Sequence, residues 1–326
     1  MDEVLENAAG RVFSDHEDDA AALWRALDET GIARAAARGA GLSAADVFGL
    51  LRLSGSRATP VPLAETLMAA RLLAAAGIDQ PAGRLTLAAG GFFAHGRLTA
   101  DLRAVPFAPA TDALALLAQS EDGPAVLLLS LAEADAAPAR HLGLDPAADL
   151  LFAAVRPLAA APAPWGAEEM RADCALARAA QMVGAMEAVL DMTLDHAATR
   201  EQFGRPLARF QAIQHKLAEM AQEAAAAGAA VEAAVEIAGP ETPPGADAAA
   251  IAKLRASEAA GIVAAHAHQT HGAIGIAAEH PLHLFTRRLW RWRDEFGDEN
   301  DWALSLGRAA AAPDAPRLRD LILGET

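Results

Sequence analysis

The sequence of 326 residues contains no tyrosine, and aromatic residues supply only 5% of it. An aromatic platform on which nucleobases stack would therefore have to be built from very few side chains. Basic residues are also few compared with acidic ones, 27 against 43, which gives a formal net charge of -16 at pH 7. Since binding to polyanions depends on neutralising phosphates with Lys and Arg, we expect no nucleic-acid partner.

Cysteine is nearly absent as well. Cys174 is the single thiol, which excludes a disulfide within the chain and any metal site made of several cysteines. The N-terminus lacks a basic segment, and the alanine-rich residues 221–239 carry three glutamates. The sequence therefore predicts neither a signal peptide nor a membrane span, and we expect a cytoplasmic protein.

Hydrophobic residues make up 53% of the chain and charged residues 21%, a composition typical of a folded protein with a sizeable core. Residues 1–80 have the pattern of a small helical domain. We expect its helices over residues 19–30, 43–53 and 63–76. Residues 84–158 change to short apolar runs between Gly, Pro and Asp-Gly turn signals, which predicts a β domain. We expect its strands at residues 85–89, 113–117, 125–129 and 150–155.

The proline-rich residues 159–165 predict a stiff linker, and beyond them the chain becomes a series of long helices. Apolar residues recur at helical spacing in four segments of residues 166–326. We expect these helices over residues 169–198, 210–237, 246–271 and from residue 282 onward. Short turns between long helices predict an antiparallel four-helix bundle. The expected fold class is therefore mainly α with a central β domain.

Two motifs in this helical part carry possible chemistry. The turn between the first two long helices reads Thr-Arg-Glu-Gln-Phe-Gly-Arg-Pro-Leu over residues 199–207, with Gln211 just after it. The guanidinium of Arg200 beside a helix N-terminus can hold a phosphate with two hydrogen bonds. The alternative is an ordinary turn with solvated polar residues.

The second motif combines histidines with glycines. Five histidines fall within residues 266–283, but residues 266, 268 and 271 do not share one helix face, and no acidic residue stands among them before Glu279. We therefore expect no metal site. Gly272 and Gly275 instead predict a tight loop at a helix end, where backbone N–H groups and the amide of Gln269 face an anion or a polar ring.

A third segment, residues 287–293, interleaves four arginines with two tryptophans. It has the composition of a nucleic-acid patch, but Leu289 and Trp292 belong to the apolar stripe of the fourth long helix. Four acidic residues follow between residues 294 and 299. A solvated or intersubunit face with salt bridges is therefore the favoured interpretation.

The two motifs together resemble the C-terminal half of the acyl-CoA dehydrogenase family. The resemblance rests on Arg-Glu-Gln-Phe-Gly-Arg-Pro at residues 200–206, on Phe-Gln-x-x-Gln-His at 210–215, and on Gln-x-His-Gly-x-Ile-Gly at 269–275. The order of an N-terminal helical domain, a middle β-barrel-like domain and a C-terminal four-helix bundle is also that of the family. The resemblance covers nearly the whole chain and is weakest in the middle.

The resemblance implies an FAD enzyme that removes the α-proton and β-hydride of an acyl-CoA thioester. It further implies an oligomer and an electron-transfer flavoprotein as electron acceptor. Arg200 and Gln211 would contact the FAD pyrophosphate and ribose, with Gln202 and Phe203 nearby. The adenine half of an FAD held mainly by a neighbouring subunit would contact three more residues: Gln269, Gly272 and Ala273.

The sequence departs from the family at the flavin ring and at the catalytic base. The middle segment near residues 87–91 lacks the ring-binding motif, and no Trp occurs between Trp24 and Trp165. The usual base position corresponds to Phe296, next to Glu295, and the alternative position corresponds to Cys174, next to Asp173. Glu295 is the best candidate, because Phe296 beside it would desolvate the carboxylate and raise its pKa.

Three functions follow from these departures. In the first, the chain is one subunit of a heteromeric acyl-CoA dehydrogenase and gives the adenine and pyrophosphate half-site, while a partner chain gives the ring site and the base. In the second, it is a self-sufficient homomeric dehydrogenase with Glu295 as base. In the third, it is a structural or assembly protein without activity. A flavin monooxygenase relative, which needs no carboxylate base, is a minor fourth alternative.

Overall fold

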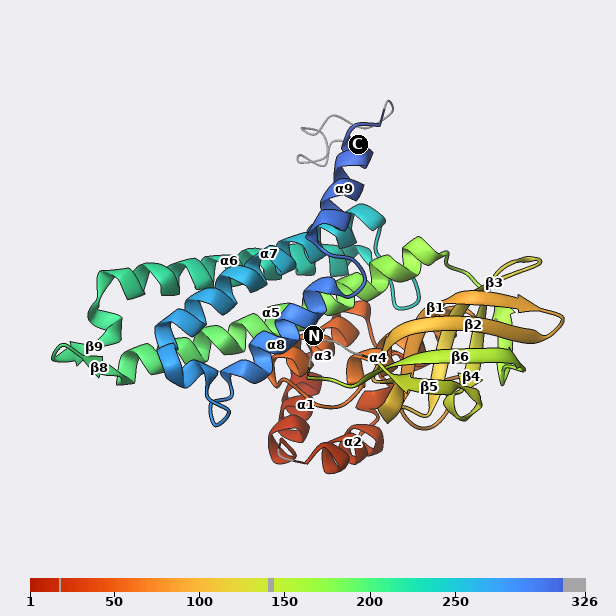
Figure 1. Ribbon diagram of the computed structural model, residues 1–326, viewed down its shortest axis with the longest axis horizontal. Coiled ribbons are helices and arrows are strands. Elements are labelled where there is room, and N and C mark those ends of the chain that lie inside the picture. Colours follow the sequence, from red (N-terminus) through yellow and green to blue (C-terminus); the bar gives the residue numbers. More distant parts are fainter. Residues whose placement is uncertain (18, 140–143, 313–326) are drawn as a thin grey trace.

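A computed structural model describes residues 1–17, 19–139 and 144–312. A helical bundle runs along the long axis of the molecule, a sheet lies at one of its ends, and the N-terminal helices lie along its side (Figure 1). This architecture confirms the predicted class, mainly α with a central β domain. Among the helices of the described residues, none is long and apolar enough to cross a membrane.

The N-terminal part contains four α-helices: α1 Glu3–Asp15, α2 Ala20–Glu29, α3 Ala44–Ser56 and α4 Leu63–Ala75. Helix α3 begins at a capping box, in which the Ser43 hydroxyl accepts the Asp46 backbone N–H at 3.2 Å and the Asp46 carboxylate accepts the Ser43 backbone N–H at 3.1 Å. Three of these helices match the predicted ones, and α1 was not predicted. Helix α4 is buried on nearly all sides and lies between the sheet and the bundle.

The sheet has seven strands in the order β5-β6-β2-β1-β3-β4-β7. Their bounds are β1 Leu85–Ala94, β2 Arg97–Pro106, β3 Ala113–Ser120, β4 Gly123–Ser130, β5 Asp135–Pro138, β6 Ala147–Val155 and β7 Ala159–Pro162. Strands β1 and β3 pair in parallel, and the other neighbours are antiparallel. Successive residues of β3 point into two cores: Leu117 packs toward the helices, and Leu116 packs into the core on the other face of the sheet.

Three strands of this sheet, β2, β5 and β7, differ from the sequence-based expectation. The short strand β5 was not predicted. Strand β2 was not predicted, although its alternate residues Leu98, Ala100 and Leu102 are buried. The predicted linker over residues 159–165 is wrong in its first part, because residues 159–162 form β7 and pair with residues 125–128 of β4. The sheet therefore continues almost to the first residue of the bundle.

The bundle consists of α5 Ala167–Thr199, α6 Gln211–Ile237, α7 Ala246–His271 and α8 Leu282–Asp294, and α9 Glu299–Ala310 follows it. The hairpin β8 Glu201–Gln202 and β9 Arg205–Pro206 joins α5 to α6. Short 3-10 helices occur at Ile32–Arg34, Ala108–Ala110, Leu131–Glu133, Leu207–Arg209 and Gly272–Ile276. Helix α5 contacts α3, α4, α6, α7 and α8, so it is the central element of the molecule.

Helices α3 and α5 meet at two glycines. A Cβ atom added to Gly55 would collide with the carbonyl oxygen of Gln181, and one added to Gly184 would collide with the carbonyl oxygen of Arg52. The two backbones therefore approach each other more closely than any residue with a side chain would permit. This contact fixes the N-terminal helices against the bundle.

Candidate functional site

The predicted phosphate contacts lie at the end of the bundle that is farthest from the sheet, where the β8–β9 hairpin projects (Figure 1). Phe203 and Gly204 form its two-residue turn, with φ of 52° and 76°, and two positive φ values are what a tight hairpin of this kind requires. Four predicted contact residues are exposed around this turn: Arg200, Gln202, Phe203 and Gln211. The sequence thus folds locally into a projecting turn that carries a guanidinium and two amides.

Phe203 is unusual because an aromatic side chain occupies a left-handed position with 92% of its surface exposed. Its ring makes an edge contact with Phe210 at 6.2 Å between centroids, and the Arg205 guanidinium lies 4.1 Å from the centroid of the Phe210 ring. An exposed aromatic residue in a strained backbone conformation is typical of a contact surface for a ligand or another chain.

The second motif lies at the same end of the bundle. Helix α7 ends at His271, Gly272 follows with φ of 64°, and Gln269, Gly272 and Ala273 are exposed. The ring of His271 stacks on the ring of His196, which lies in the last turn of α5, with 4.4 Å between the centroids. The structure therefore brings the two motifs together, as an arrangement around one ligand requires.

The chemistry of these donors fits one half of a dinucleotide. Arg200 supplies a permanent positive charge, and the side chains of Gln202, Gln211 and Gln269 supply both donors and acceptors. Two buried ring nitrogens nearby, Nδ1 of His268 and Nε2 of His271, have no hydrogen-bond partner among the described residues. Such a set suits a pyrophosphate and an adenosine, whereas a flavin ring would need a different surface.

Glu295 lies elsewhere, after α8 and at the junction with the sheet. Its two carboxylate oxygens accept hydrogen bonds from Nε of Arg178 and Nε of Arg291, each at 2.6 Å. Arg178, which is buried in α5, also forms an ion pair with Glu65 of α4 and donates to Oε1 of Gln181 at 2.5 Å. The candidate base is thus one member of a buried network of charges.

The prediction that Phe296 raises the pKa of Glu295 is wrong. Burial does act to raise this pKa, but the charges and hydrogen bonds of Arg178 and Arg291 outweigh it, and the pKa of Glu295 lies below its usual value. Glu65 differs, because burial dominates there and raises the pKa of Glu65. Glu295 is therefore ionised, as a base must be, but its lowered pKa and its pairing with two arginines make it a weak base.

The residues at the alternative base position are also engaged. Asp173 accepts two hydrogen bonds from the Arg71 guanidinium, at 3.0 and 2.7 Å, and both side chains are at most 2% exposed. Arg71 donates in addition to the carbonyl oxygens of Gly239, Pro240 and Thr242 in the loop between α6 and α7. Burial raises the pKa of the Cys174 thiol well above its ordinary value.

A very small void and a larger cavity lie close to Glu295. Among Glu65, Arg178 and Glu295 the free volume is about 10 Å³, too small for a ligand. A cavity of about 270 Å³ opens beside it, between strands β1 and β2 and the turn after α8, with Ala104 and Phe296 in its lining. Both of these residues have positive φ, 50° and 59°, so the wall of the cavity is strained.

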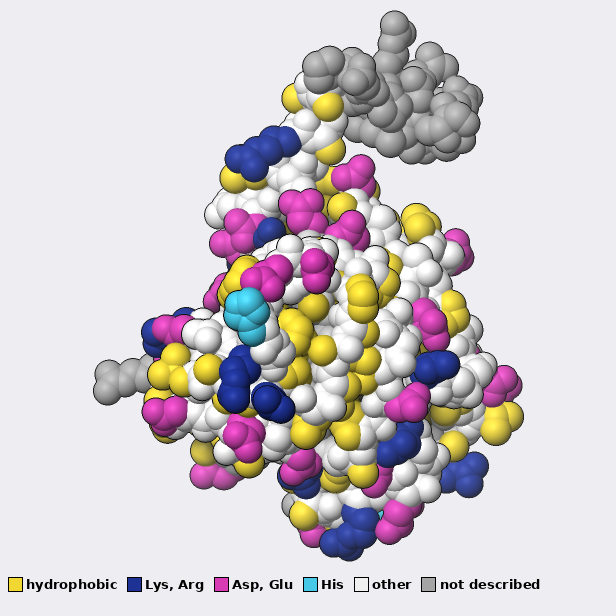
Figure 2. All heavy atoms as spheres, turned by 90° about the vertical axis from the view of Figure 1, so that its right-hand side faces the viewer, with side chains coloured by type: hydrophobic (Ala, Val, Ile, Leu, Met, Phe, Trp, Pro, Cys, Tyr) yellow, Lys and Arg dark blue, Asp and Glu magenta, His cyan; other side chains and the backbone are white. Residues whose placement is uncertain are grey.

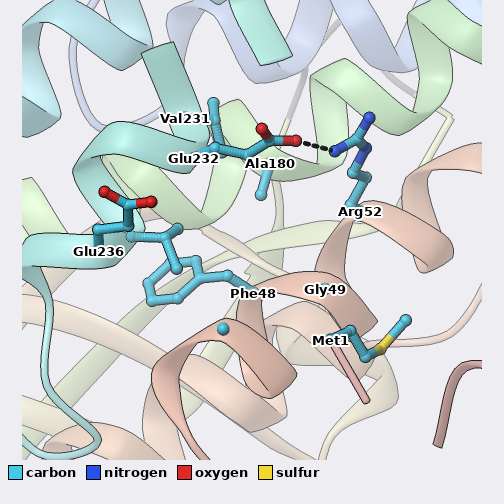
Figure 3. Close-up of a pocket in the computed structure, with 10 residues that line it drawn as sticks. Met1, Phe48, Gly49, Arg52, Ala180, Val231, Glu232 and Glu236 are labelled. Atoms are coloured by element: carbon cyan, nitrogen blue, oxygen red, sulfur yellow. Dashed lines mark hydrogen bonds and ion pairs between the residues drawn. The ribbon is translucent and has the colours of Figure 1, made fainter. Parts of the chain in front are cut away.

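A separate cavity of about 310 Å³ lies between α3 and α6 and is shown in Figure 3. Phe48 and Val231 lie at its apolar side, and Arg52 pairs with Glu232 at its rim, with 2.9 Å between Nη1 and Oε1. It contains none of the predicted site residues, so it is not part of the site that the two motifs form.

Three of the four arginines of residues 287–293, namely Arg288, Arg291 and Arg293, form the predicted salt bridges, but not on a purely solvated face. Arg288 is 4% exposed and pairs with Asp145, with 2.7 Å between Nη2 and Oδ1, and Nε of Arg293 donates to Glu299 at 2.7 Å. These arginines hold α8 against the sheet and against α9. In the described part of the chain, no group of three His, Cys, Asp or Glu residues could hold a metal ion.

Known proteins resemble this chain in sequence. Residues 172–293 match the sequence profile described as "Acyl-CoA dehydrogenase, C-terminal domain". The acyl-CoA dehydrogenase IpdE2 of Mycobacterium tuberculosis is 41% identical over 114 residues, 35% of this chain and 34% of that protein. The match thus spans about a third of the length of IpdE2. The acyl-CoA dehydrogenase FadE27 of the same organism is 28% identical over 81% of both chains.

Solved structures extend the similarity to the whole fold. The steroid ACAD Tcur3481-Tcur3483 superimposes with a TM-score of 0.83 and 27% identity, over 94% of this chain and 96% of that one. The ChsE4-ChsE5 complex of Mycobacterium tuberculosis reaches a TM-score of 0.81 over 96% and 99%, and its 24% identity supports the shared fold alone. Sequence motifs, domain order and fold agree: residues 172–293 match the C-terminal domain of the acyl-CoA dehydrogenase family, and the whole chain has the acyl-CoA dehydrogenase fold.

Proposed function

We propose that this chain is a subunit of a heteromeric, FAD-dependent acyl-CoA dehydrogenase. In this proposal it supplies the adenine and pyrophosphate half-site at the free end of the bundle, and a partner chain supplies the ring site and the base. The substrate class that we propose is an acyl-CoA thioester, and the electron acceptor is an electron-transfer flavoprotein. Two relatives of the same fold, Tcur3481-Tcur3483 and ChsE4-ChsE5, are named as pairs of chains.

The observation that carries the proposal is the engagement of both carboxylates that lie next to the base positions, Glu295 beside Phe296 and Asp173 beside Cys174. Glu295 is held by two arginines and Asp173 by a third, all through hydrogen bonds of 3.0 Å or less. Freeing either carboxylate would remove a charged partner from a buried arginine, Arg178 or Arg71, and breaking a buried ion pair costs about 3 to 5 kcal/mol. A base that must approach the substrate is therefore better supplied by another chain.

The spacing along α5 supports a flavin site shared between chains. Arg178, which pairs with Glu295, lies in the first half of α5, and Arg200 directly follows the end of this helix, about 33 Å away at 1.5 Å per residue. One dinucleotide is too short to occupy both the donors around Arg200 and the cavity beside Glu295. The half-site of this chain therefore serves a flavin whose ring lies against a partner.

Bound flavin would supply the hydride acceptor, and the residues of this chain would bind and orient it. Arg200 would neutralise a pyrophosphate oxygen, and the amides of Gln211 and Gln269 would fix the ribose and adenine. Apolar surface for a partner is present: Phe92, Leu151 and Leu158 of the sheet region are 48 to 65% exposed. Figure 2, which views the sheet end of the molecule, shows hydrophobic side chains gathered across the middle of that face.

One observation favours the second candidate, a self-sufficient homomeric dehydrogenase. The cavity of about 270 Å³ is bordered by Glu295 and Phe296, so a small ligand there would lie close to the candidate base. In this case the carboxylate would have to leave Arg178 or Arg291 before it could accept a proton.

The test is to purify the chain alone and together with a co-expressed full-length acyl-CoA dehydrogenase from a neighbouring gene, and to record the visible spectrum of each. We expect little flavin on the chain alone and a restored flavin content in the complex. Glu295→Gln in the flavin-loaded complex should keep the rate of flavin reduction by acyl-CoA within a few-fold of wild type.

Glu299→Gln is the matched control, because Glu299 also pairs with an arginine of α8, Arg293, but lies outside the candidate base position. A loss of several orders of magnitude in Glu295→Gln, with acyl-CoA binding kept and Glu299→Gln unaffected, would assign the base to this chain. A yellow homo-oligomer that acyl-CoA bleaches would likewise refute the heteromer.

A further inference from the structure

Four histidine rings meet at the end of the bundle that carries the proposed half-site. His196 of α5 stacks on His271 of α7, and His280 makes an edge contact with His271 at 4.8 Å between centroids. His268 lies one turn earlier on α7, and its Nε2 is 2.9 Å from the Thr286 hydroxyl oxygen. The cluster therefore joins α5, α7, α8 and the loop that contains Gly272.

The hydrogen bonds of His271 define its uncharged state. Nδ1 lies 2.8 Å from the carbonyl oxygen of Ala267, so this nitrogen must carry a hydrogen and donate it. Nε2 is then an acceptor in the neutral ring, and within the described residues this buried atom has no partner. Protonation of the 95% buried ring would turn Nε2 into a second donor. The backbone of Met192 would offset part of the cost of burying this charge, but burial is the largest effect and lowers the pKa of His271.

The charged groups around the rings all have the same sign. On α5 the neighbours are His196 and Arg200, on α7 they are His268 and His271, and His280 and His283 complete the set. Burial, followed by these neighbours, lowers the pKa of four rings: His196, His268, His271 and His280. In a chain with a net charge of -16, a group of basic side chains without a carboxylate partner needs an explanation.

The carboxylates that are adjacent in sequence to the clustered histidines do not provide the missing negative charge. The side chains of Asp195 and Glu279 are exposed and make no hydrogen bond to the rings. His266, one turn before Thr270 on α7, shows the contrast, because its Nε2 lies 2.8 Å from the carboxylate of Glu219. The cluster thus lacks an anion that a neighbouring histidine has.

We propose that the rings of His196, His268, His271 and His280 form a proton-coupled anion site, which takes up protons from solvent as the pyrophosphate of a dinucleotide binds beside Arg200 and Gly272. The inference rests on the proposed function and assigns these histidines as positioning residues of that half-site. The bound anion stabilises the imidazolium form of the rings, and by reciprocity protonation strengthens binding of the anion.

The sign of the pH dependence follows. In the free protein the rings titrate below the ordinary value of histidine, and a bound pyrophosphate raises their pKa. Between these two values the complex binds more protons than the free protein does, so the affinity rises as pH falls. Each proton taken up strengthens binding by up to about tenfold per pH unit.

The experiment is calorimetric titration of the full chain, in the assembled complex stripped of flavin, with FAD and with inorganic pyrophosphate at pH 5.5, 6.5 and 7.5. The difference in binding enthalpy between two buffers of different ionisation enthalpy gives the number of protons taken up. We expect FAD to bind about three- to tenfold more tightly for each unit of lower pH, with proton uptake between about 0.5 and 1. Pyrophosphate should bind more weakly, with uptake of the same sign.

Two variants assign the protons to the cluster. His196→Phe keeps a ring stacked on His271 but removes one titrating group, and His280→Gln is a second variant if the first fails to fold. Either should lose at least half of the proton uptake. His266→Gln is the matched control, because His266 lies on the same helix with its own carboxylate partner, and its uptake should equal that of wild type.

FAD binding with full affinity and no pH dependence would overturn this inference and leave the proposed function intact. Equal uptake in wild type, His196→Phe and His280→Gln would also overturn it, since the protons would then come from elsewhere. If neither FAD nor pyrophosphate binds to the assembled complex at any pH, the half-site itself is absent and both proposals fail.

Discussion

Arg200 combines a fixed backbone with an outward side chain. Its N–H donates to the His196 carbonyl oxygen at 2.9 Å, and its own carbonyl oxygen accepts the Leu207 N–H at 2.9 Å. Its side chain is exposed and makes no hydrogen bond within the described residues. A guanidinium whose backbone is already positioned loses little entropy when it binds an anion.

Arg200→Ala should weaken FAD binding to the assembled complex about ten- to a hundredfold. The reason is the loss of a charge-assisted hydrogen bond, which contributes about 1.5 to 3 kcal/mol. Lys should restore only part of the affinity, because it cannot form two parallel bonds. Equilibrium dialysis measures the effect, with Arg209→Ala, an exposed arginine of the same connection, as control. Equal FAD retention in both variants would leave Arg200 as a solvated turn residue.

Single residues also mark the limit of what the sequence can predict. The turn at residues 199–207 and the loop at 272–275 were predictable, because Gly, Pro and polar residues are adjacent there in sequence. The pairing of Glu295 with Arg178 was not, since 117 positions separate them and no local pattern connects them. The expected pKa shift therefore had the wrong sign: the nearby Phe296 was visible in the sequence, and the distant arginines were not.

At the scale of elements, the seam between α3 and α5 is the tightest helix contact described above. Gly55 and Gly184 face carbonyl oxygens of the opposite helix, and neither glycine has a positive φ. Space, and not backbone conformation, is therefore the reason that glycine occupies both positions.

Gly184→Ala should destabilise the protein by about 1 to 3 kcal/mol or more, because the added methyl group forces α3 away from α5. Gly10→Ala is the control: a Cβ there meets no atom within 4 Å, and alanine favours the α1 helix by up to about 1 kcal/mol. Urea denaturation followed by tryptophan fluorescence gives both values. Equal urea midpoints for the two variants would mean that α3 and α5 accommodate the added methyl group without loss of stability.

The elements that were predicted and those that were missed differ in their patterns. Helices α5 to α8 have apolar residues at a period near 3.6, and this pattern can be recognised in the sequence without knowledge of the tertiary structure. Strand β2 has charged residues at its outward positions, for example Asp101 and Arg103, and therefore has the composition of a loop. Strand β7 consists of three alanines and a proline, and only its pairing with β4 makes it a strand.

At the scale of the molecule, Lys253 of α7 joins the end of α8 and the turn after it through one buried ammonium group. Its Nζ donates to the carbonyl oxygens of Arg293 at 2.7 Å and Gly297 at 2.9 Å, so α7 holds the end of α8 and the turn before α9. The side chain is 0% exposed, and burial lowers the pKa of Lys253 to about 8. The folded chain therefore releases the proton of Lys253 near pH 8, whereas the unfolded chain keeps it up to a pH near 10.5.

This difference predicts a stability that rises with pH. Between pH 8 and 10.5 the unfolded chain binds the proton on Lys253 more strongly than the folded chain, so the free energy of unfolding increases with pH by up to about 3 kcal/mol. The chain has no tyrosine, but Cys174 acts in the opposite direction above about pH 9, because burial raises the pKa of its folded thiol well above the unfolded value of 9.0. A reference variant that keeps Cys174 cancels this contribution. Urea denaturation at pH 7.5, 8.5 and 9.5 measures the rise.

Lys253→Met provides the reference, because it fills similar space and does not titrate. The difference in unfolding free energy between wild type and Lys253→Met should grow in favour of wild type as pH rises through this range. A difference that stays constant would show that the buried amine keeps its proton at every pH tested.

The contacts of Arg71 have a consequence for the order in which the chain folds during synthesis. This α4 residue needs Asp173 of α5 and the carbonyl oxygens of residues 239–242, which lie 168 to 171 positions later. Until the ribosome has released that loop, the guanidinium has only part of its final partners, and burying it would cost several kcal/mol. In a nascent chain, the N-terminal helices therefore cannot complete their packing against the bundle until about three quarters of the sequence has left the ribosome.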